Sequence, residues 1–147
     1  MSLPESISSR LRLPVLCSPL FIISNPDLVL AQCKAGVIGS FPSLNARPLS
    51  QLDEWLHRIT EELAAWDRDH PDQLSAPFAV NQIVHKTNDR LEKDLELCEK
   101  YKVPLANLVL PFRTAVKSRN LPTTWHWYIL IVVMLSSVYS IQAEWWI

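Results

Sequence analysis

Glycine is scarce in this chain of 147 residues, which contains 2 glycines and 11 prolines. Loops that hold phosphate groups on backbone N–H groups usually need several glycines, because the backbone must approach the ligand closely. The sequence contains no GxGxxG motif and no P-loop, and it also lacks the GxSxG and HExxH motifs of hydrolases and metalloproteases. A phosphate-binding loop is therefore not part of this chain.

Neither charge nor cysteine is in excess. The 14 Lys and Arg residues balance 15 Asp and Glu residues, so no basic surface indicates a nucleic-acid partner. Cys17, Cys33 and Cys98 are far apart and show no CxxC spacing, so we interpret them as reduced core thiols. No recurrent ligand spacing indicates a metal site. Residues 1–12 form an N-terminal extension without the apolar run of a secretory signal, and we expect a cytoplasmic protein.

Short apolar runs recur along residues 13–110, as expected for strands buried on both faces. They predict strands at residues 13–17, 37–40 and 78–83 and a fourth strand that begins near Val103. Helical patterns separate the runs, and this βαβ alternation is typical of a parallel sheet. The prediction is an α/β fold, a partial (β/α)8 TIM barrel that contains the first three to four βα units. An open flavodoxin-like sheet is the alternative, against which the absence of a phosphate loop argues.

The three expected helices have different start signals. Asn25 is a candidate N-cap, and Gly36 stands where a helix ends in the left-handed conformation. Ser50 and Asp53 resemble a capping box for the second helix, which has the clearest amphipathic pattern. Asn88 is expected to cap the third helix.

The chain changes character after Arg119. Residues 111–147 form a hydrophobic, Trp-rich tail, and its segment 125–141 has basic residues before it and tryptophans on both sides, as a transmembrane anchor would. Two other interpretations stay open. The tail is either an element that completes the core or sequence foreign to the fold, introduced by a shifted frame or altered splicing, because the βα pattern breaks near Ala106.

Candidate functional residues follow the predicted strands, since function in parallel α/β folds collects at the carboxyl ends of strands. Ser18, Pro19 and Leu20 follow the first strand, and Asn81 lies near the end of the third. The amide of Asn81 can donate to and accept from a flat heteroaromatic ring, or it can be a satisfied core amide. His85 is a candidate base, although a histidine without a partner in the sequence is more often a surface residue.

Six segments carry a resemblance to a known family: Leu13–Phe21, Ser24–Pro26, Ala35–Pro42, Asn45–Pro48, Leu52–Trp55 and Pro77–Lys86. In this order and spacing they resemble the start of the nitronate monooxygenase family, formerly called 2-nitropropane dioxygenases. The resemblance covers about residues 10–107.

The resemblance implies an FMN-dependent TIM barrel, an oxidoreductase that oxidises alkyl nitronates with O2. The backbone of Ser18, Pro19 and Leu20 would pass close to the flavin, with Leu20 in place of the more usual Met. Asn81 matches a flavin-contacting Asn of the family. The protein's part in such chemistry is to hold the ring and to shape the pocket. The substrate-pocket candidates are Phe21, Phe41 and His85.

The family's catalytic His and its later Gly-rich stretch have no counterpart here, so no catalytic residue is assigned in this chain. We expect a truncated chain that lacks turnover. Its partners by family would be a small nitronate and O2. The alternative is a non-catalytic fragment, tethered to a membrane through residues 125–141, or an interaction variant that associates with itself or with full-length barrels through an open strand edge.

Overall fold

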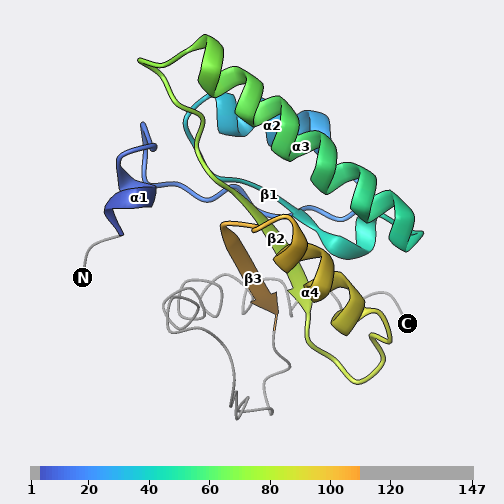
Figure 1. The fold of residues 1–147 in the computed structure, drawn as a ribbon. Helices are drawn as coiled ribbons and strands as arrows, with labels where there is room; N and C mark the ends of the chain where they lie inside the picture. Colours follow the sequence, from blue (N-terminus) through green and yellow to red (C-terminus); the bar gives the residue numbers. More distant parts are fainter. Residues whose placement is uncertain (1–3, 110–147) are drawn as a thin grey trace.

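A computed structural model of the chain describes residues 4–109. Their sheet contains three parallel strands in the order β1-β2-β3, namely β1 (Gly39–Pro42), β2 (Phe78–Ile83) and β3 (Leu105–Val109). An isolated parallel bridge joins Leu16 to Ile38 and places a first strand segment beside β1. Four successive segments therefore lie side by side in chain order, as the sequence predicts for the start of a barrel (Figure 1).

Helices connect the strands. The described helices are α1 (Glu5–Ser8), α2 (Pro26–Lys34), the 3-10 helix η1 (Ser43–Asn45), α3 (Leu49–Asp69) and α4 (Leu91–Lys100). Figure 1 shows α2, α3 and α4 together on one side of the sheet and α1 away from them on the other. In a TIM barrel all crossover helices lie on the outer side of the strands, and the described helices α2, α3 and α4 have this arrangement.

The main core lies between the sheet and these three helices. Phe41 and Val80 face the helices and are 0% exposed, and the ring of Phe41 packs edge-on against Trp55 at 5.6 Å between centroids. Leu52, Leu56 and Ile59 of α3 are also 0% exposed, as helical residues at 3- and 4-residue spacing on one buried face should be. A second, smaller cluster lies on the opposite face of the sheet. It contains Ile38, Ala79 and Leu105, with Ile7, Leu11 and Leu16 packed against it.

Helix α2 begins and ends as its sequence predicts. The side chain of Asn25 accepts a hydrogen bond from the N–H of Leu28 at 3.0 Å, and Pro26 occupies the first turn. Gly36, two residues beyond the helix, has a φ of 86°, where an added Cβ would lie 2.6 Å from Cγ of Arg12. Asn25 is thus suited to the N-terminus of α2 by its bond to the helix backbone, and Gly36 is required by its left-handed φ and by the nearby Arg12 side chain.

The predicted caps of the other two helices are wrong. Helix α3 begins after Pro48 with no side-chain cap, and Asp53 instead accepts hydrogen bonds from Lys100 Nζ at 2.7 Å and Tyr101 Oη at 2.9 Å. These bonds lower the pKa of the Asp53 carboxyl. Arg90 stands at the N-cap of α4, and Asn88 donates to the carbonyl of Ile83 at 2.9 Å. Asp53 and Asn88 therefore do not cap these helices, because each makes a contact elsewhere, Asp53 with α4 and Asn88 with the loop before α4.

Strand boundaries also differ from the prediction. The first strand is reduced to the Leu16 bridge, since Pro14 has no N–H and Val15 N–H donates locally to the carbonyl of Leu13 at 2.8 Å. β1 extends to Pro42, which a strand tolerates at its end. β3 pairs with β2 as far as Val109, so the parallel pattern continues beyond Ala106.

The capped start of α2 and the uncapped start of α3 give a direct comparison. Asn25→Ala is expected to lower the free energy of unfolding by about 1 kcal/mol, because the Leu28 N–H loses its acceptor. Ser50→Ala is the matched control and is expected to change it by less than about 0.5 kcal/mol, because no side chain caps α3. Urea unfolding followed by circular dichroism measures both. Equal losses would contradict the assigned caps.

The buried thiols allow a second test. Burial raises the pKa of Cys33 and of Cys98 to about 11, whereas Cys17 is only partly buried and its pKa is raised for the same reason. Since thiolates are the reactive form, we expect iodoacetamide at pH 8 to modify Cys17 before the other two. Peptide mass spectrometry gives the order, and in urea all three should react alike.

The same shifts predict a pH dependence of stability. An acid whose folded pKa is raised stabilises the fold while it is protonated, and this contribution is lost as pH rises from the unfolded value of 9.0 towards about 11. The free energy of unfolding should therefore fall over this pH range. A free energy of unfolding that stays constant with pH there would contradict the burial of Cys33 and Cys98.

Candidate functional site

The carboxyl ends of the strands bring amide side chains to one edge of the sheet. Asn81 of β2 and Asn107 of β3 are register partners and are 5% and 6% exposed. Each lies two residues beyond a member of the smaller cluster, Ala79 or Leu105, and so faces the same side of the sheet, the inner side of a barrel. Ser40 of β1 lies two residues beyond Ile38 on this face.

These amides are only partly satisfied. Asn81 Nδ2 donates to the backbone carbonyl of Asn107 at 3.3 Å, while Asn107 Oδ1 is buried without a hydrogen-bond partner in the described part of the chain. A buried polar atom without a partner costs about 1–3 kcal/mol and requires an explanation. The sequence analysis predicts one amide at this edge, Asn81, and the structure places a second one, Asn107, beside it.

The loop after the first strand is held by an amide from the next βα loop. Asn45 Nδ2 donates to the carbonyls of Leu20 and Ser24 at 3.0 and 2.9 Å, and its Oδ1 accepts from the N–H of Ile22 at 3.3 Å. Ser24 Oγ accepts from the N–H of Leu20 at 2.8 Å. The backbone groups of Leu20 are therefore used within the protein, and Ser18 and Pro19 present the remaining surface of this loop.

The tip of the same loop carries exposed apolar side chains. Phe21, Ile22 and Ile23 are 61%, 73% and 62% exposed. Ile22 has a φ of 67°, which is unfavourable for a β-branched residue. Arg47 lies over the ring of Phe21, with 5.8 Å between the guanidinium carbon and the ring centroid. Strain and apolar exposure at one loop tip are typical of a functional surface.

An ion pair between the partly buried Arg90 and the buried Asp94 fixes the loop that contains Asn45. Arg90 Nη1 donates to the carbonyls of Ala46 and Arg47 at 2.8 and 2.7 Å, and its Nη2 donates to Oδ1 of Asp94 at 3.0 Å. Asp94 is 0% exposed. The start of α4 thus positions the β1–α3 loop, and Asn45 in turn positions the loop around Leu20.

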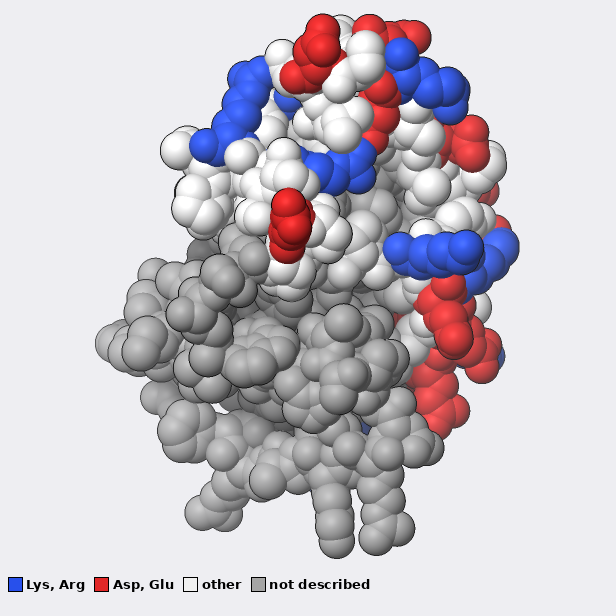
Figure 2. All heavy atoms as spheres, turned by 60° about the vertical axis from the view of Figure 1, so that its left-hand side comes forward, with Lys and Arg blue, Asp and Glu red and all other residues white. Residues whose placement is uncertain are grey.

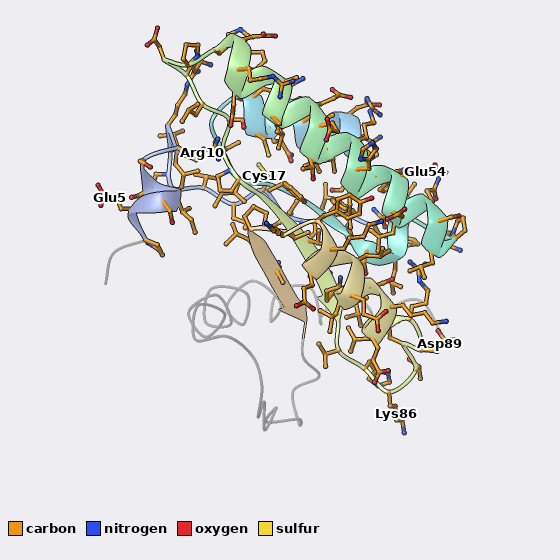
Figure 3. All side chains as sticks on the ribbon, in the orientation of Figure 1. Glu5, Arg10, Cys17, Glu54, Lys86 and Asp89 are labelled. Carbon is orange, nitrogen blue, oxygen red and sulfur yellow. The ribbon has the colours of Figure 1, made fainter. Side chains whose placement is uncertain are left out.

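The predicted pocket residues do not all come to this edge. The prediction that Phe41 lines a substrate pocket at this edge is wrong, because its side chain is buried on the helix-facing side of the sheet against Trp55. His85 lies in the β2–α4 loop and its Nδ1 is 2.8 Å from Oγ1 of Thr87. Figure 3 shows Lys86 and Asp89 of this loop beyond the carboxyl end of β2, at the opposite end from Arg10.

Three of these residues are not found by the sequence analysis. Asn45 resembles an ordinary turn residue, and Arg90 lies in a polar stretch. Asn107 lies just beyond Ala106, where the sequence analysis expects the βα pattern to break, although β3 continues to Val109. Among residues 4–109 no group of three His, Cys, Asp or Glu is placed to hold a metal ion. None of the helices in that range combines the length and hydropathy that a membrane crossing requires, and the tail segment 125–141 lies outside the described residues.

These features define a partial TIM barrel with a candidate ligand face at the carboxyl ends of its strands. Among solved structures, FabK from Thermotoga maritima is similar, with a TM-score of 0.53 and 19% sequence identity. The match covers 75% of this chain and 32% of FabK, so the chain spans about a third of that protein. No family model and no curated protein matches the sequence. At this identity the likeness supports the fold alone.

The Asn45 contacts lead to a prediction. Asn45→Ala removes three hydrogen bonds, so we expect the free energy of unfolding to fall by about 1–3 kcal/mol and the amide of Ile22 to exchange faster. Hydrogen exchange with mass spectrometry over residues 18–24 measures the loop. Gln51→Ala, which removes one exposed bond to Arg47 N–H, is the matched control. Unchanged protection in Asn45→Ala would contradict the role of this amide.

Proposed function

We propose that residues 13–110 are the first part of a flavin-binding barrel, an FMN-dependent oxidoreductase of the nitronate monooxygenase type. The observation that carries the proposal is the position of Asn81, a nearly buried amide on the inner face at the carboxyl end of β2. In a TIM barrel this end of the strands is where cofactors and substrates bind. The choice of flavin as the ligand rests on the resemblance of the Ser18–Leu20 and Pro77–Lys86 segments to the nitronate monooxygenase family.

The chain's own residues fit the edge of a flat, polar ring. Asn81 Nδ2 has a second N–H, and Asn107 Oδ1 has no partner within residues 4–109. The loop containing Ser18 and Pro19 is held in one shape by Asn45, so its backbone is available as a preformed wall. Bound FMN would supply the electron-transfer chemistry, and these residues would bind and orient its ring.

The nitronate substrate and O2 belong to the same proposal, with Phe21 and His85 as the pocket residues whose loops reach this edge. The charges on the visible face of the described part mix both signs, as Figure 2 shows, and give no preference for a nucleic acid. A membrane-tethered, non-catalytic fragment is the second candidate, favoured by the apolar segment 125–141. Carbonate extraction of membranes separates the two, since only an anchored chain resists it.

Titration of the purified full chain with FMN, followed by flavin fluorescence, tests the site. We expect weak binding, with no stoichiometric flavin after purification and no nitrite released from nitronates, because the phosphate loops of the family have no counterpart in this sequence. Asn81→Ala is expected to weaken FMN binding about tenfold, the equivalent of one hydrogen bond.

Gln73→Ala is the matched amide control, because Gln73 lies exposed in the α3–β2 connection. Its FMN affinity should equal that of the unmodified chain. Equal affinities of Asn81→Ala and Gln73→Ala would remove Asn81 from the site, and a stoichiometric yellow protein would show that the chain needs no phosphate loop to retain the cofactor.

A further inference from the structure

The loop after the first strand ends in an apolar tip, residues 21–23, which residues 4–109 leave uncovered. Phe21, Ile22 and Ile23 are each more than half exposed. The amide of Asn45 bonds to the backbone carbonyls on both flanks of the tip, so these side chains cannot turn inward while those bonds remain. Three adjacent large apolar side chains, unlike a single one, are typical of a surface that another segment or molecule covers.

The chain leaves the described sheet at the same edge as the apolar tip. The Leu16 segment, β1, β2 and β3 all run parallel, so their carboxyl ends lie together. The loop with the tip follows the first of these segments, and Val109 ends the last of them. Residues 110–147 therefore begin at the edge that carries the tip, and Figure 1 shows β3 ending on this side of the sheet.

The distance to the tip is short for the length of chain available. Three strand spacings separate the first segment from β3, which amounts to about 15 Å at about 4.8 Å each. The 15 residues from 110 to 124 can span roughly 50 Å when they are extended. A segment beyond them reaches the tip, and because it belongs to the same chain its effective concentration there is on the order of millimolar.

Residues 120–143 match the apolar tip in character. They contain no Asp, Glu, Lys or Arg, and the part from 125 to 141 is almost wholly apolar. Contact between this segment and the tip therefore removes apolar surface of both from water without burying a charge of the segment. Arg47 lies over the Phe21 ring, and a guanidinium favours aromatic neighbours such as Trp125 and Trp127, which begin the apolar part.

We infer that residues 120–143 dock on the apolar tip of the same molecule and cover it. The segment then lies at the border of the candidate ligand face and limits access to that face from the side of the first strand. A lipid bilayer and a second copy of the chain are the competing occupants of the tip. The inference does not depend on flavin, and its tests are made without FMN.

Photo-crosslinking from the tip identifies its occupant. The full chain with p-benzoylphenylalanine in place of Phe21 is irradiated in buffer and with vesicles of phosphatidylcholine and phosphatidylserine. We expect peptide mass spectrometry to join position 21 to residues 120–143 under both conditions, in a product of single-chain mass. The same probe in place of Leu74, which is 43% exposed in the connection that precedes β2, is the matched control and should give no such link.

Proteolysis gives an independent readout. Chymotrypsin cleaves after aromatic residues, which the segment from 125 to 139 supplies. Ile22→Asp places a charge in the tip, and the φ of 67° at this position suits Asp better than Ile, so the loop should keep its shape. Cleavage within 125–139 should become at least about tenfold faster in this variant, because an apolar segment does not cover an unpaired carboxylate. Leu74→Asp is the matched control and should be cleaved at the unmodified rate.

Far-ultraviolet circular dichroism should show the same fold in every variant. Links from position 21 to lipid or to a second copy, or the lack of any link to residues 120–143, overturn the inference. Equal rates of cleavage within 125–139 for the unmodified chain and for folded Ile22→Asp overturn it as well.

Discussion

The helix-facing core around Phe41 and Val80 holds this structure together, because it attaches α2, α3 and α4 to the same side of the sheet. Once the crossover helices share one side, successive strands must run parallel and lie in chain order. Their carboxyl ends then meet at one edge, where Asn81 and Asn107 become neighbours although 26 positions separate them in the sequence. The position of the candidate site is in this sense a consequence of apolar packing on the opposite face.

Polar side chains position the loops at the carboxyl ends of the strands. They form a chain of contacts that leads from a buried residue to the outer loop. Arg90, anchored by the buried Asp94, holds the carbonyls of the β1–α3 loop, and Asn45 of that loop holds the one before it. Ser43 donates to Gln82 at 2.8 Å, and Gln82 donates to Cys98 Sγ at 3.4 Å, which ties the same loop to β2 and α4. One oxygen of this network, Asp94 Oδ2, is buried without a hydrogen-bond partner among residues 4–109, which reduces the net stabilisation that the ion pair contributes.

The features that the sequence predicts correctly depend on neighbours a few residues away. Asn25 and Gly36 act on their own helix, and the alternation of strands and helices follows from local hydrophobic periodicity. The failures have a common cause in contacts between distant residues. Asp53 matches a capping box but is held by Lys100 and Tyr101, and Phe41 reads as a strand-end residue although the pleat turns it into the core. The clamps made by Asn45 and Arg90 span 25 and 44 residues, and no local pattern carries them.

Both glycines of the chain lie at positions where the packing of α2 and β1 requires them. Gly36 takes a left-handed φ beyond α2, and at Gly39 a Cβ would lie 2.7 Å from the carbonyl oxygen of Val29, so the strand backbone passes close against the helix. The loops at the carboxyl edge, residues 18–24, 43–48 and 84–90, contain no glycine. Side-chain hydrogen bonds hold the first two in shape, and a ligand that needed either to move would have to break those bonds. The described face is therefore rigid, and these two loops have little capacity to close over a bound ligand.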